Sequence, residues 1–357
     1  MISAAIIGCG AIARKRHAPA CASHRDVGLS GFYDPAVQNA EDLAKRYGGK
    51  TYGSREELLS DEKVDAVIVC VPERFHCETV IECLEAGKHV LCEKPMAMNV
   101  EEARRMFRAW KESGKILSVA FSQRFYPEYR IAKKMIREGA IGRVLMFRTC
   151  LANSGVENFV YGNPEDFYDT QIQNVGGVMS NVGCHRVDLI RYLLEREIVQ
   201  VFSYTPVLDK RFRDGRPIDR EDTALSILKL EGGVTGMLWS SWCNYGGPDA
   251  GTRIFGTEGA LEISADGNVT IEKKDGTKIR VEIEKREEEE NGFSVTERFL
   301  DSILEGLPTS PDGKDGLICM EVLDAIERSN RSGTWESVNS AWETGAVDKN
   351  EPKEEKG

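Results

Sequence analysis

The chain has 357 residues, of which 41% are hydrophobic and 29% charged, and a formal net charge of −11. That length is too great for one comfortable hydrophobic core, so we expect two domains. The acidic balance argues against nucleic acid as the main partner, because neutralising phosphates needs clustered Lys and Arg.

No run of apolar residues is long enough to span a membrane, so a membrane role is not expected. The N-terminal segment has no basic region before its apolar residues, which is typical of a first strand rather than a signal peptide. Ten cysteines are scattered along the chain without a CxxC pair. They indicate neither a zinc site nor a redox pair and favour a reducing compartment. We expect a cytoplasmic protein with no bound metal.

The first 121 residues alternate short apolar runs with helical patterns. The predicted strands are Ile2–Ile7, Gly28–Tyr33, Ala66–Val71, His89–Cys92 and Ile116–Ala120. The predicted helices are Ile12–Ser23, Gln38–Tyr47, Arg55–Leu59, Phe75–Ala86 and Val100–Ser113. This alternation predicts an α/β fold, in which helices cover both faces of a parallel sheet. We therefore predict an N-terminal Rossmann domain over residues 1–121.

The sequence pattern changes after residue 121. The next predicted elements are a helix, a strand, a polar loop and a second helix, at Pro127–Glu138, Arg143–Cys150, Ala152–Asn174 and Val178–Glu195. From Ile198 onward, strands separated by hairpin turns follow, and helices at Ser294–Leu304 and Gly316–Ser329 come last. This predicts an α+β domain with a large, mostly antiparallel open sheet over residues 122–340. Residues 341–357 have the composition of a flexible tail.

Two strands of this second domain, Thr223–Leu230 and Val234–Trp242, carry apolar residues on both of their faces. One face should pack on the helices of the domain. The other also needs cover, and a second subunit is the obvious candidate. We expect a homodimer or homotetramer that assembles through the C-terminal sheet.

A dinucleotide-binding motif, G-x-G-x-x-A, begins at Gly8. It follows a predicted strand and opens a predicted helix, which is the context that the binding mechanism requires. Gly8 would form the tight turn, and Gly10 would let the backbone approach a pyrophosphate. Ala11 and Ile12 would supply the start of the helix that faces the phosphates.

Asp34 ends the second predicted strand, where a carboxylate would accept hydrogen bonds from the hydroxyl groups of the adenosine ribose. It would repel a 2′-phosphate, and no Arg follows in the next three residues. NAD is therefore expected rather than NADP. A turn carboxylate before Pro35 is the structural alternative.

The third strand leads into Val71 and Pro72, which should line the nicotinamide half of the same crevice. His76 is a further candidate for this site, although it also suits the start of a helix.

Lys94 lies at the carboxyl end of another predicted strand, within Glu93-Lys94-Pro95. Pro95 cannot continue the strand, so the chain must turn there, and the Lys94–Pro95 bond is a candidate for the cis form. A lysine near the positive charge of a nicotinamide would have a lowered pKa, which suits proton transfer with a hydroxyl. A surface lysine is the alternative.

A second polar group lies between Gly176 and Asp188. At about 100° per residue, one helix face would carry a polar stripe of four residues, Asn181, His185, Asp188 and Tyr192. The rest of this helix is largely apolar, so it should be buried. Its polar stripe must then find partners in the protein or on a ligand. A satisfied structural histidine is the alternative to a catalytic His185.

Four motifs together resemble the glucose–fructose oxidoreductase / inositol dehydrogenase / MocA family over roughly residues 1–330. They are GCGAIA near the start, HVLCEKP around Lys94, Gln123-Arg124-Phe125, and GG-x-x-x-N-x-G-x-H-x-x-D from Gly176 to Asp188. The resemblance implies a homo-oligomer that transfers a hydride between NAD(P) and a hydroxyl-bearing carbon of a sugar, cyclitol or related polyol.

The same resemblance implies that Lys94 and His185 are the catalytic lysine and histidine, that Glu93 and Lys94 border the cofactor, and that Arg124 lies near the substrate. The aromatic residues of the 152–174 loop, Tyr161 among them, should shape the pocket. Two positions depart from the family pattern. Asn181 replaces the usual Asp, which moves the proton-transfer role toward Lys94, and Glu73 replaces an Asn after the proline.

Three functions are compatible with these features. The first is a sugar or polyol dehydrogenase. The second is a redox-neutral enzyme that cleaves or eliminates glycosides with tightly bound NAD. The third is a non-catalytic NAD sensor, and the pairing of Lys94 with His185 argues against it.

Overall fold

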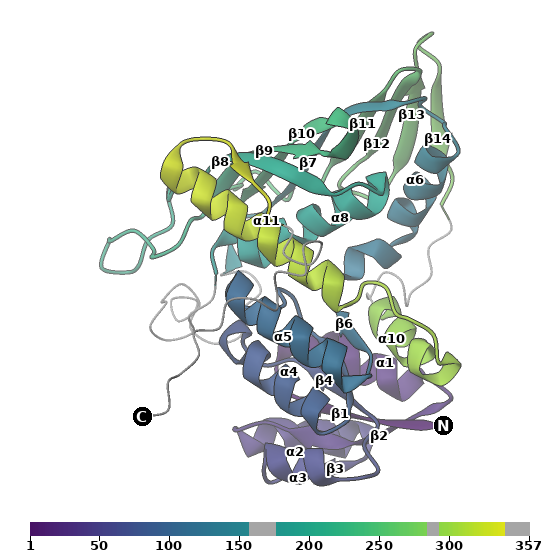
Figure 1. Cartoon of the computed structure of the whole chain (residues 1–357), viewed down its shortest axis with the longest axis vertical. Coiled ribbons are helices and arrows are strands. Elements are labelled where there is room, and N and C mark those ends of the chain that lie inside the picture. The colour runs from purple at the N-terminus through teal and green to yellow at the C-terminus, as the bar shows by residue number, and fades with distance from the viewer. Residues whose placement is uncertain (157–175, 284–292, 340–357) are drawn as a thin grey trace, which may run out of the picture.

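The structure, a computed structural model, describes residues 1–156, 176–283 and 293–339. These residues form two halves, with a Rossmann half below and an open-sheet half above in Figure 1. Nearly all of the predicted 152–174 loop and all of the predicted tail lie outside the described residues. Within the described ranges, no helix is long and apolar enough to cross a membrane.

The N-terminal half contains a sheet of six parallel strands in the order β3-β2-β1-β4-β5-β6. The strands are β1 (Ile2–Ile7), β2 (Val27–Tyr33), β3 (Lys50–Thr51), β4 (Ala66–Val69), β5 (His89–Cys92) and β6 (Leu117–Val119). The strand order reverses between β1 and β4, and ligands of such sheets bind beyond the strand ends at this point. The α/β prediction is confirmed, and the two-residue β3 was not predicted.

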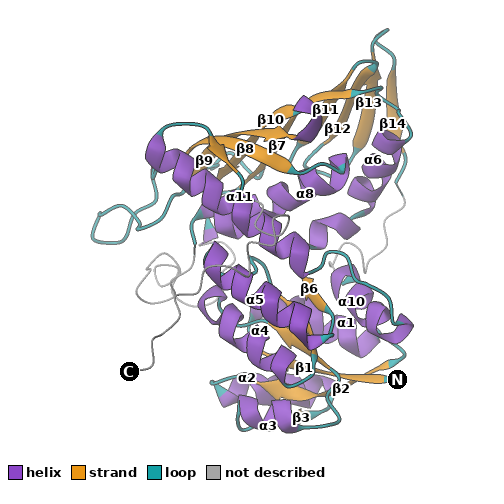
Figure 2. Ribbon diagram, viewed as in Figure 1, coloured by secondary structure: helices purple, strands orange, loops and turns teal. Residues whose placement is uncertain are grey.

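Helices pack against both faces of this sheet, as the strand pattern predicts (Figure 2). They are η1 (Ala13–His17), α1 (Ala18–Ser23), α2 (Val37–Tyr47), α3 (Arg55–Ser60), α4 (His76–Glu85) and α5 (Val100–Ser113). Alternate side chains of each strand point to opposite faces. In β1, Ala5 and Ile7 therefore join one buried cluster, while Ala4 and Ile6 join another.

The second half contains a sheet of nine strands in the order β14-β13-β12-β11-β7-β10-β9-β8-β15. The strands are β7 (Val144–Ala152), β8 (Ile198–Tyr204), β9 (Thr223–Leu230), β10 (Thr235–Ser241), β11 (Thr252–Gly256), β12 (Gly259–Ile263), β13 (Val269–Lys273), β14 (Lys278–Val281) and β15 (Glu336–Ser337). All neighbours in this order are antiparallel except β7 and β10, which are parallel. The predicted mostly antiparallel open sheet is confirmed.

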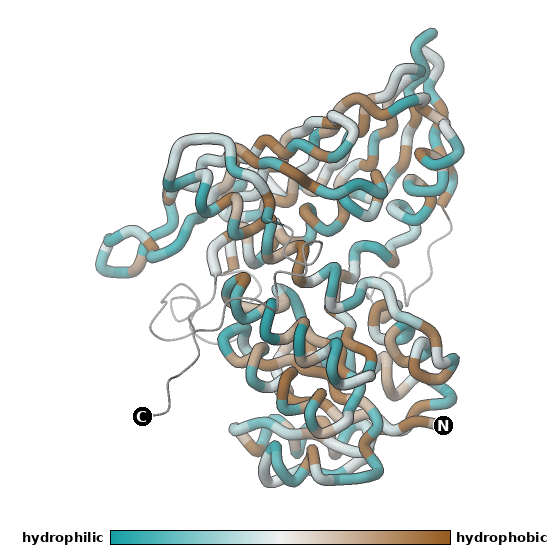
Figure 3. The backbone as a smooth tube through the Cα atoms, in the orientation of Figure 1, coloured by the Kyte–Doolittle hydropathy of each residue, from teal (hydrophilic) through white to brown (hydrophobic). Residues whose placement is uncertain are grey.

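One face of this sheet is covered and the other is open. Along β9, Ala224 and Leu228 are fully buried, whereas Leu225 and Ile227 are 49% and 38% exposed. Met237, which lies opposite Ile227 on β10, is 58% exposed. The backbone coloured by hydropathy shows brown, apolar stretches along the strands and mostly hydrophilic outer turns (Figure 3). The outward face of the central strands is apolar, as the sequence predicts.

The remaining helices are η3 (Ser122–Phe125), α6 (Pro127–Arg137), η5 (Met179–Gly183), α8 (Cys184–Leu194), α10 (Ser294–Glu305) and α11 (Gly313–Ser332). Two of them connect the halves. Phe299 and Leu300 of α10 belong to the buried cluster under the Rossmann sheet, so this C-terminal helix completes the N-terminal half. Helix α11 packs against α5 and β6 on one side and against α8 and β8 on the other.

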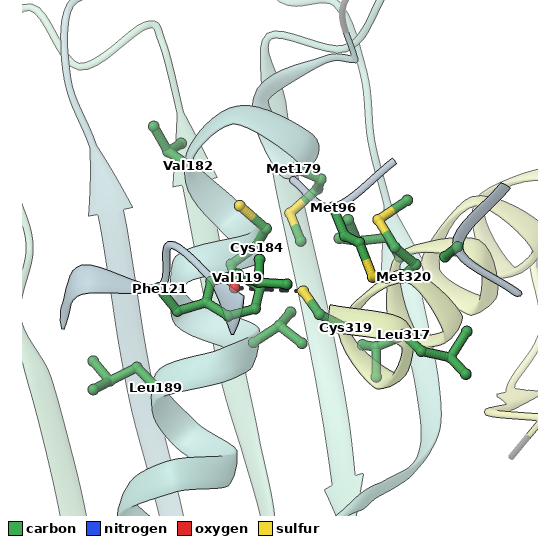
Figure 4. Close-up of a cluster of buried hydrophobic side chains, with 14 of the residues drawn as sticks. Met96, Val119, Phe121, Met179, Val182, Cys184, Leu189, Leu317, Cys319 and Met320 are labelled. Carbon is green, nitrogen blue, oxygen red and sulfur yellow. Dashed lines mark hydrogen bonds between the residues drawn. The ribbon is translucent and has the colours of Figure 1, made fainter. Parts of the chain in front are cut away.

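The junction between the halves is apolar at its centre. Figure 4 shows side chains from the Rossmann half meeting side chains of η5, α8 and α11, with the Cys319 thiol donating a hydrogen bond to the backbone oxygen of Cys184. The labelled members are Met96, Val119, Phe121, Met179, Val182, Cys184, Leu189, Leu317, Cys319 and Met320. Because these residues form one buried cluster with both cores, the junction positions the two halves firmly against each other.

Candidate active site

The turn after β1 has the backbone geometry that a dinucleotide needs. Gly8 has a φ of +90°, and a Cβ there would lie 2.6 Å from the backbone carbonyl of Cys70, beyond the end of β4. At Gly10, by contrast, a Cβ would point into open space. The backbone is helical from Ala11 and Ile12 onward, so the first N–H groups of this helix lack intrahelical partners and are available to an anion.

Asp34 directly follows β2 and contacts the glycine turn. Its carboxylate accepts hydrogen bonds from the N–H groups of Cys9 at 2.7 Å and Ala36 at 2.9 Å. Arg14, which the sequence analysis did not single out, donates to the backbone oxygens of Cys9 at 3.0 Å and Asn39 at 3.1 Å. The Arg14 guanidinium and the Asp34 carboxylate, predicted to bind the ribose, therefore both contact the backbone of Cys9.

The segment after β4 contains Val71, Pro72 and His76. His76 is buried, and its Nδ1 and Nε2 lie 2.9 Å and 3.0 Å from the backbone oxygens of Pro95 and Val71. The ring ties the end of β4 to the turn after β5, and burial lowers its pKa. These contacts give His76 a structural role, while a cofactor contact by the backbone of Val71 and Pro72 stays a prediction.

Lys94 lies two residues beyond β5, at the same edge of the sheet as the glycine turn. Its Nζ donates a hydrogen bond to the backbone oxygen of Asn181 at 3.0 Å, across the junction between the halves. The Lys94–Pro95 peptide bond is cis. Lys94 is therefore a partly buried residue of the crevice, and not the surface lysine of the alternative interpretation.

Glu93, beside Lys94, is held by a buried network. Its Oε1 accepts a hydrogen bond from His17 Nε2 at 3.0 Å and lies 3.5 Å from Arg16, while Oε2 accepts from the N–H of Lys94 at 3.0 Å. The other ring nitrogen of His17 lies 2.8 Å from the Thr296 hydroxyl on α10. Burial would raise the pKa of Glu93, but the neighbouring His17, Arg16 and Lys94 hold it well below its usual range. Glu93 is thus a charged group that fixes the backbone of Lys94.

His185 is the second residue of α8 and lies near Lys94. Burial and the positive charge of Lys94 lower the pKa of its imidazole well below the ordinary value. Its Nδ1 is enclosed and has no hydrogen-bond partner among the described residues. A neutral imidazole with an unused nitrogen suits a hydroxyl of a bound substrate. Lys94 and His185, far apart in sequence, are thus brought to one site.

Asn181 belongs to η5, a π-helical turn, so the assumed 100° spacing does not hold there. Its backbone oxygen binds Lys94, and within the described ranges no hydrogen bond joins its side chain to His185. The C-terminal half of the predicted polar stripe has a different partner, because Asp188 and Tyr192 contact Arg124. The stripe therefore divides into a site-facing end and a structural end.

The guanidinium of Arg124 is fully engaged by acids of the second half. Nε and Nη2 donate to both oxygens of Asp188, and Nη1 and Nη2 also bind Asp315 at 3.0 Å and 2.9 Å. Nη1 further donates to the Ser310 hydroxyl at 3.2 Å. With its five donors accounted for and 7% of the residue exposed, Arg124 has no group left for a substrate. The predicted substrate contact of Arg124 stays a prediction, and in this structure the buried Asp188 and the partly buried Asp315 hold the side chain.

Glu73 is a buried acid of this site to which the sequence analysis gave no role. It starts the short helix η2 (Glu73–Phe75) after Pro72 and is 9% exposed. Its Oε2 accepts a hydrogen bond from the N–H of Gly176 at 3.2 Å. Burial raises its pKa to about 7, although Lys94 and the Gly176 N–H act to lower it. Its position directly after the strand-end proline was the signal that could have found it.

Comparison with known proteins assigns the chain to a family. Residues 2–121 match the oxidoreductase family with an NAD-binding Rossmann fold, and residues 129–262 match the GFO/IDH/MocA C-terminal domain. The chain belongs to the Gfo/Idh/MocA family of oxidoreductases. The family resemblance predicted from the sequence motifs is thus confirmed.

Several relatives of this Gfo/Idh/MocA protein have named activities. The chain is 28% identical over 305 residues to the scyllo-inositol 2-dehydrogenase (NAD(+)) of Bacillus subtilis (strain 168). The match covers 84% of this chain and 85% of the relative. It is 34% identical over 193 residues to the D-glucoside 3-dehydrogenase of Escherichia coli (strain K12), covering 53% of each. The solved structure of a levoglucosan dehydrogenase in complex with NADH and levoglucosan has the same fold, with a TM-score of 0.84, 23% identity, and coverage of 95% of this chain and 100% of that chain.

The residues of this Gfo/Idh/MocA protein fit a nicotinamide dinucleotide. The open space at Gly10 would leave room for the pyrophosphate, and Asp34, beside the glycine turn, would meet the adenosine ribose. Tyr161, predicted to touch the substrate, lies outside the described residues. Within the described ranges, no group of three or more His, Cys, Asp and Glu side chains could hold a metal ion.

Proposed function

We propose that the protein is an NAD-dependent dehydrogenase or reductase that transfers a hydride between nicotinamide and a carbinol or carbonyl carbon of a sugar, inositol or related polyol. The observation that carries this proposal is the pairing of Lys94 and His185, two groups able to move a proton, beside the strand ends where the dinucleotide would lie. The activities for which the relatives are named, an inositol and a glucoside dehydrogenase among them, support the substrate class.

The chemistry divides between cofactor and protein. Nicotinamide, when bound, accepts or gives the hydride. Lys94 and His185 are positioned to bind the reacting hydroxyl and to accept its proton as the carbonyl forms. Burial keeps His185 neutral at pH 7, so it can exchange a proton with the hydroxyl or orient it. In the reverse direction the same groups return the proton to the carbonyl oxygen.

The test is a screen of NAD reduction by the purified protein with sugars, inositols and sugar acids, with NADP as the parallel cofactor. We expect at least one polyol or sugar to give steady NADH formation. Tightly bound NAD with glycoside cleavage and no net NADH would identify the redox-neutral alternative. Binding of NADH without turnover of any substrate in either direction would favour the NAD sensor instead.

We propose NAD rather than NADP as the cofactor because of the Asp34 carboxylate. A 2′-phosphate would meet this negative charge, and Arg14 is already engaged by Asn39 and by Asp42 at 3.5 Å. The double variant Asp34→Ser/Ala36→Arg should narrow or reverse the preference, measured as the ratio of the dissociation constants of NADH and NADPH. Tighter binding of NADPH than of NADH by the wild type would contradict this role of Asp34.

We also propose a homo-oligomer that forms through the open face of the nine-stranded sheet. Exposed apolar side chains at Leu225, Ile227 and Met237 would be covered by a second subunit. Light scattering at micromolar concentration should give the mass of a dimer or tetramer, and Ile227→Lys should reduce it. A monomeric wild type would contradict this assembly, and Lys63→Glu, at an exposed lysine of the Rossmann half, is the control for a general charge effect.

A further inference from the structure

Two side chains of the Rossmann half reach across the junction to one short segment of the second half. Lys94 binds the backbone oxygen of Asn181, and Glu73 binds the N–H of Gly176, five residues earlier. The two strands that lead to these residues, β4 and β5, are parallel neighbours paired from Ala66 with His89 to Val69 with Cys92. Their chain ends therefore emerge at the same edge, which brings an acid and a base to one crevice.

A further contact holds these two chain ends together. His76, three residues after Glu73, bridges the backbone oxygens of Val71 and Pro95. The segment that carries Glu73 is thereby fixed to the turn that carries Lys94. The buried ring thus links the two backbone segments that carry Glu73 and Lys94.

Position 181, whose backbone oxygen accepts a hydrogen bond from Lys94, carries an amide and not an acid. An amide cannot take up a proton from a reacting hydroxyl or balance a positive charge. Glu73 supplies a carboxyl group that contacts the same segment of the second half, at the N–H of Gly176. We propose that Glu73 is the acidic partner of Lys94 in catalysis and replaces the carboxylate that position 181 lacks. This inference rests on the proposed function as a hydroxyl dehydrogenase.

The proposed proton transfer balances as follows in the direction of oxidation. The carbinol carbon would lose its C–H bond, and the hydride would leave with its electron pair to the nicotinamide that the site would hold. The Lys94 ammonium gives one proton to the Glu73 carboxylate, and the resulting neutral amine takes the proton of the hydroxyl as its O–H bond breaks. Lys94 is unchanged at the end, and the carboxyl group holds the additional proton. No hydrogen bond joins Lys94 to Glu73 among the described residues, so the transfer uses a bridging water or a turn of the lysine side chain.

The surroundings of the pair support this role. Titratable groups on which Lys94 acts are Glu93, His185, His76 and Cys184. The charge that acts on Glu73 is that of Lys94, and Glu73 in turn acts on Cys184. Arg74, next in the chain, is exposed and lies over the ring of Phe75. Burial raises the pKa of Glu73 to about 7, and a catalytic acid or base works best when its pKa is near the operating pH.

The kinetic test compares Glu73→Gln, Glu73→Asp and the control Glu78→Gln, whose side chain is exposed on α4 and pairs with Arg105. We expect kcat/KM for oxidation to rise through a limb near pH 7 in the wild type and in the control. Glu73→Gln should lose this limb and about 10²-fold in kcat, the lower range for a lost acid–base group. Glu73→Asp should keep a shifted limb, and NADH affinity should be unchanged in all three. An unaltered pH profile in Glu73→Gln would overturn the proposal.

A second measurement needs no substrate. The difference infrared spectrum of wild type minus Glu73→Gln should show a carboxyl group that titrates near pH 7, and Lys94→Met should move this titration upward, because the ammonium favours the carboxylate. A carboxyl that titrates near its ordinary pKa and ignores Lys94→Met would exclude the pair. This outcome would reject the Glu73 inference while leaving the dehydrogenase proposal intact. A titration near pH 7 together with a failed substrate screen would instead reject the proposed function.

Discussion

Two polar clusters are built in opposite ways, one within the second half and one across the junction between the halves. In the Arg124 cluster (Arg124, Asp188 and Asp315), each guanidinium donor has an acceptor, and Arg124 and Asp188 are buried. In the Lys94 cluster (Lys94, Glu73 and His185), the described residues leave His185 Nδ1 without a partner and bind Lys94 and Glu73 only to backbone atoms. A saturated cluster has nothing left to offer a ligand, whereas an unsaturated one does. We therefore expect the Arg124 cluster to stabilise the fold and the Lys94 cluster to bind a ligand.

Lys94→Ala should have the largest effect on activity. Loss of the proton-transfer group should reduce turnover by about 10²–10⁴-fold, while NADH binding, measured by fluorescence titration, survives. Lys63→Ala, at an exposed lysine far from the crevice, is the matched control and should leave turnover unchanged. Near-normal turnover of Lys94→Ala on a confirmed substrate would show that the Lys94 cluster is not the reacting group.

Arg124→Met should have the largest effect on stability. It leaves the buried Asp188 without its cation, and breaking such a buried pair costs about 3–5 kcal/mol. Urea unfolding should show this loss, while Arg25→Met, at a side chain 91% exposed, should change the unfolding free energy by less than about 0.5 kcal/mol. If Arg124→Met is too unstable to purify, Arg124→Lys, which keeps the charge, should be intermediate. A raised KM at normal stability would instead restore the substrate role predicted from the sequence.

The sequence predicted the Lys94 cluster better than the Arg124 cluster for a physical reason. Parallel strands end at one edge of a sheet, so a residue just beyond a predicted strand, such as Lys94, can be placed in the crevice from local pattern alone. Arg124, by contrast, is held in part by Asp315, which lies 191 positions further along the chain. No local sequence pattern predicts that pairing. The same holds for His17, whose Thr296 partner is 279 positions away.

The helices and strands themselves were predictable because their hydrophobic periods are strong. The prediction Val100–Ser113 agrees with α5 residue for residue. The π-helical turns at Ala13–His17 and Met179–Gly183 were not foreseen, because their sequences also suit an α-helix and only packing selects the wider turn. That turn displaced Asn181 from its expected place on the helix stripe.

Glu73→Gln should change how the free energy of unfolding depends on pH. The pKa of Glu73 is about 7 in the folded protein, whereas an ordinary glutamate carboxyl has a pKa of 4.5, so the folded state binds the extra proton between these values. This contribution to stability is complete below pH 4.5 and is lost as pH rises through 7. At pH 8 the variant should be more stable than the wild type by about 1–3 kcal/mol, and the difference should vanish near pH 4.5. An equal difference at both pH values would mean that Glu73 does not titrate in this range.

Asn181→Asp should have the smallest effect on activity. It tests whether a carboxylate at position 181 can act in the site. Position 181 precedes His185 by four residues, across the join of η5 and α8, and a negative charge there favours the imidazolium, so the pKa of His185 should rise. Any limb of the pH–rate profile that His185 controls should move upward. Lys94 binds the backbone oxygen of position 181, so this contact should survive, and Asn181→Ala is the uncharged control.

The Asn181→Asp substitution should also restore turnover to Glu73→Gln, because one carboxyl group, at position 73 or at position 181, is enough to take the proton. If Asn181→Asp shifts no limb and rescues nothing, the crevice does not use a carboxylate at all, and the Lys94 cluster works through Lys94 and His185 alone.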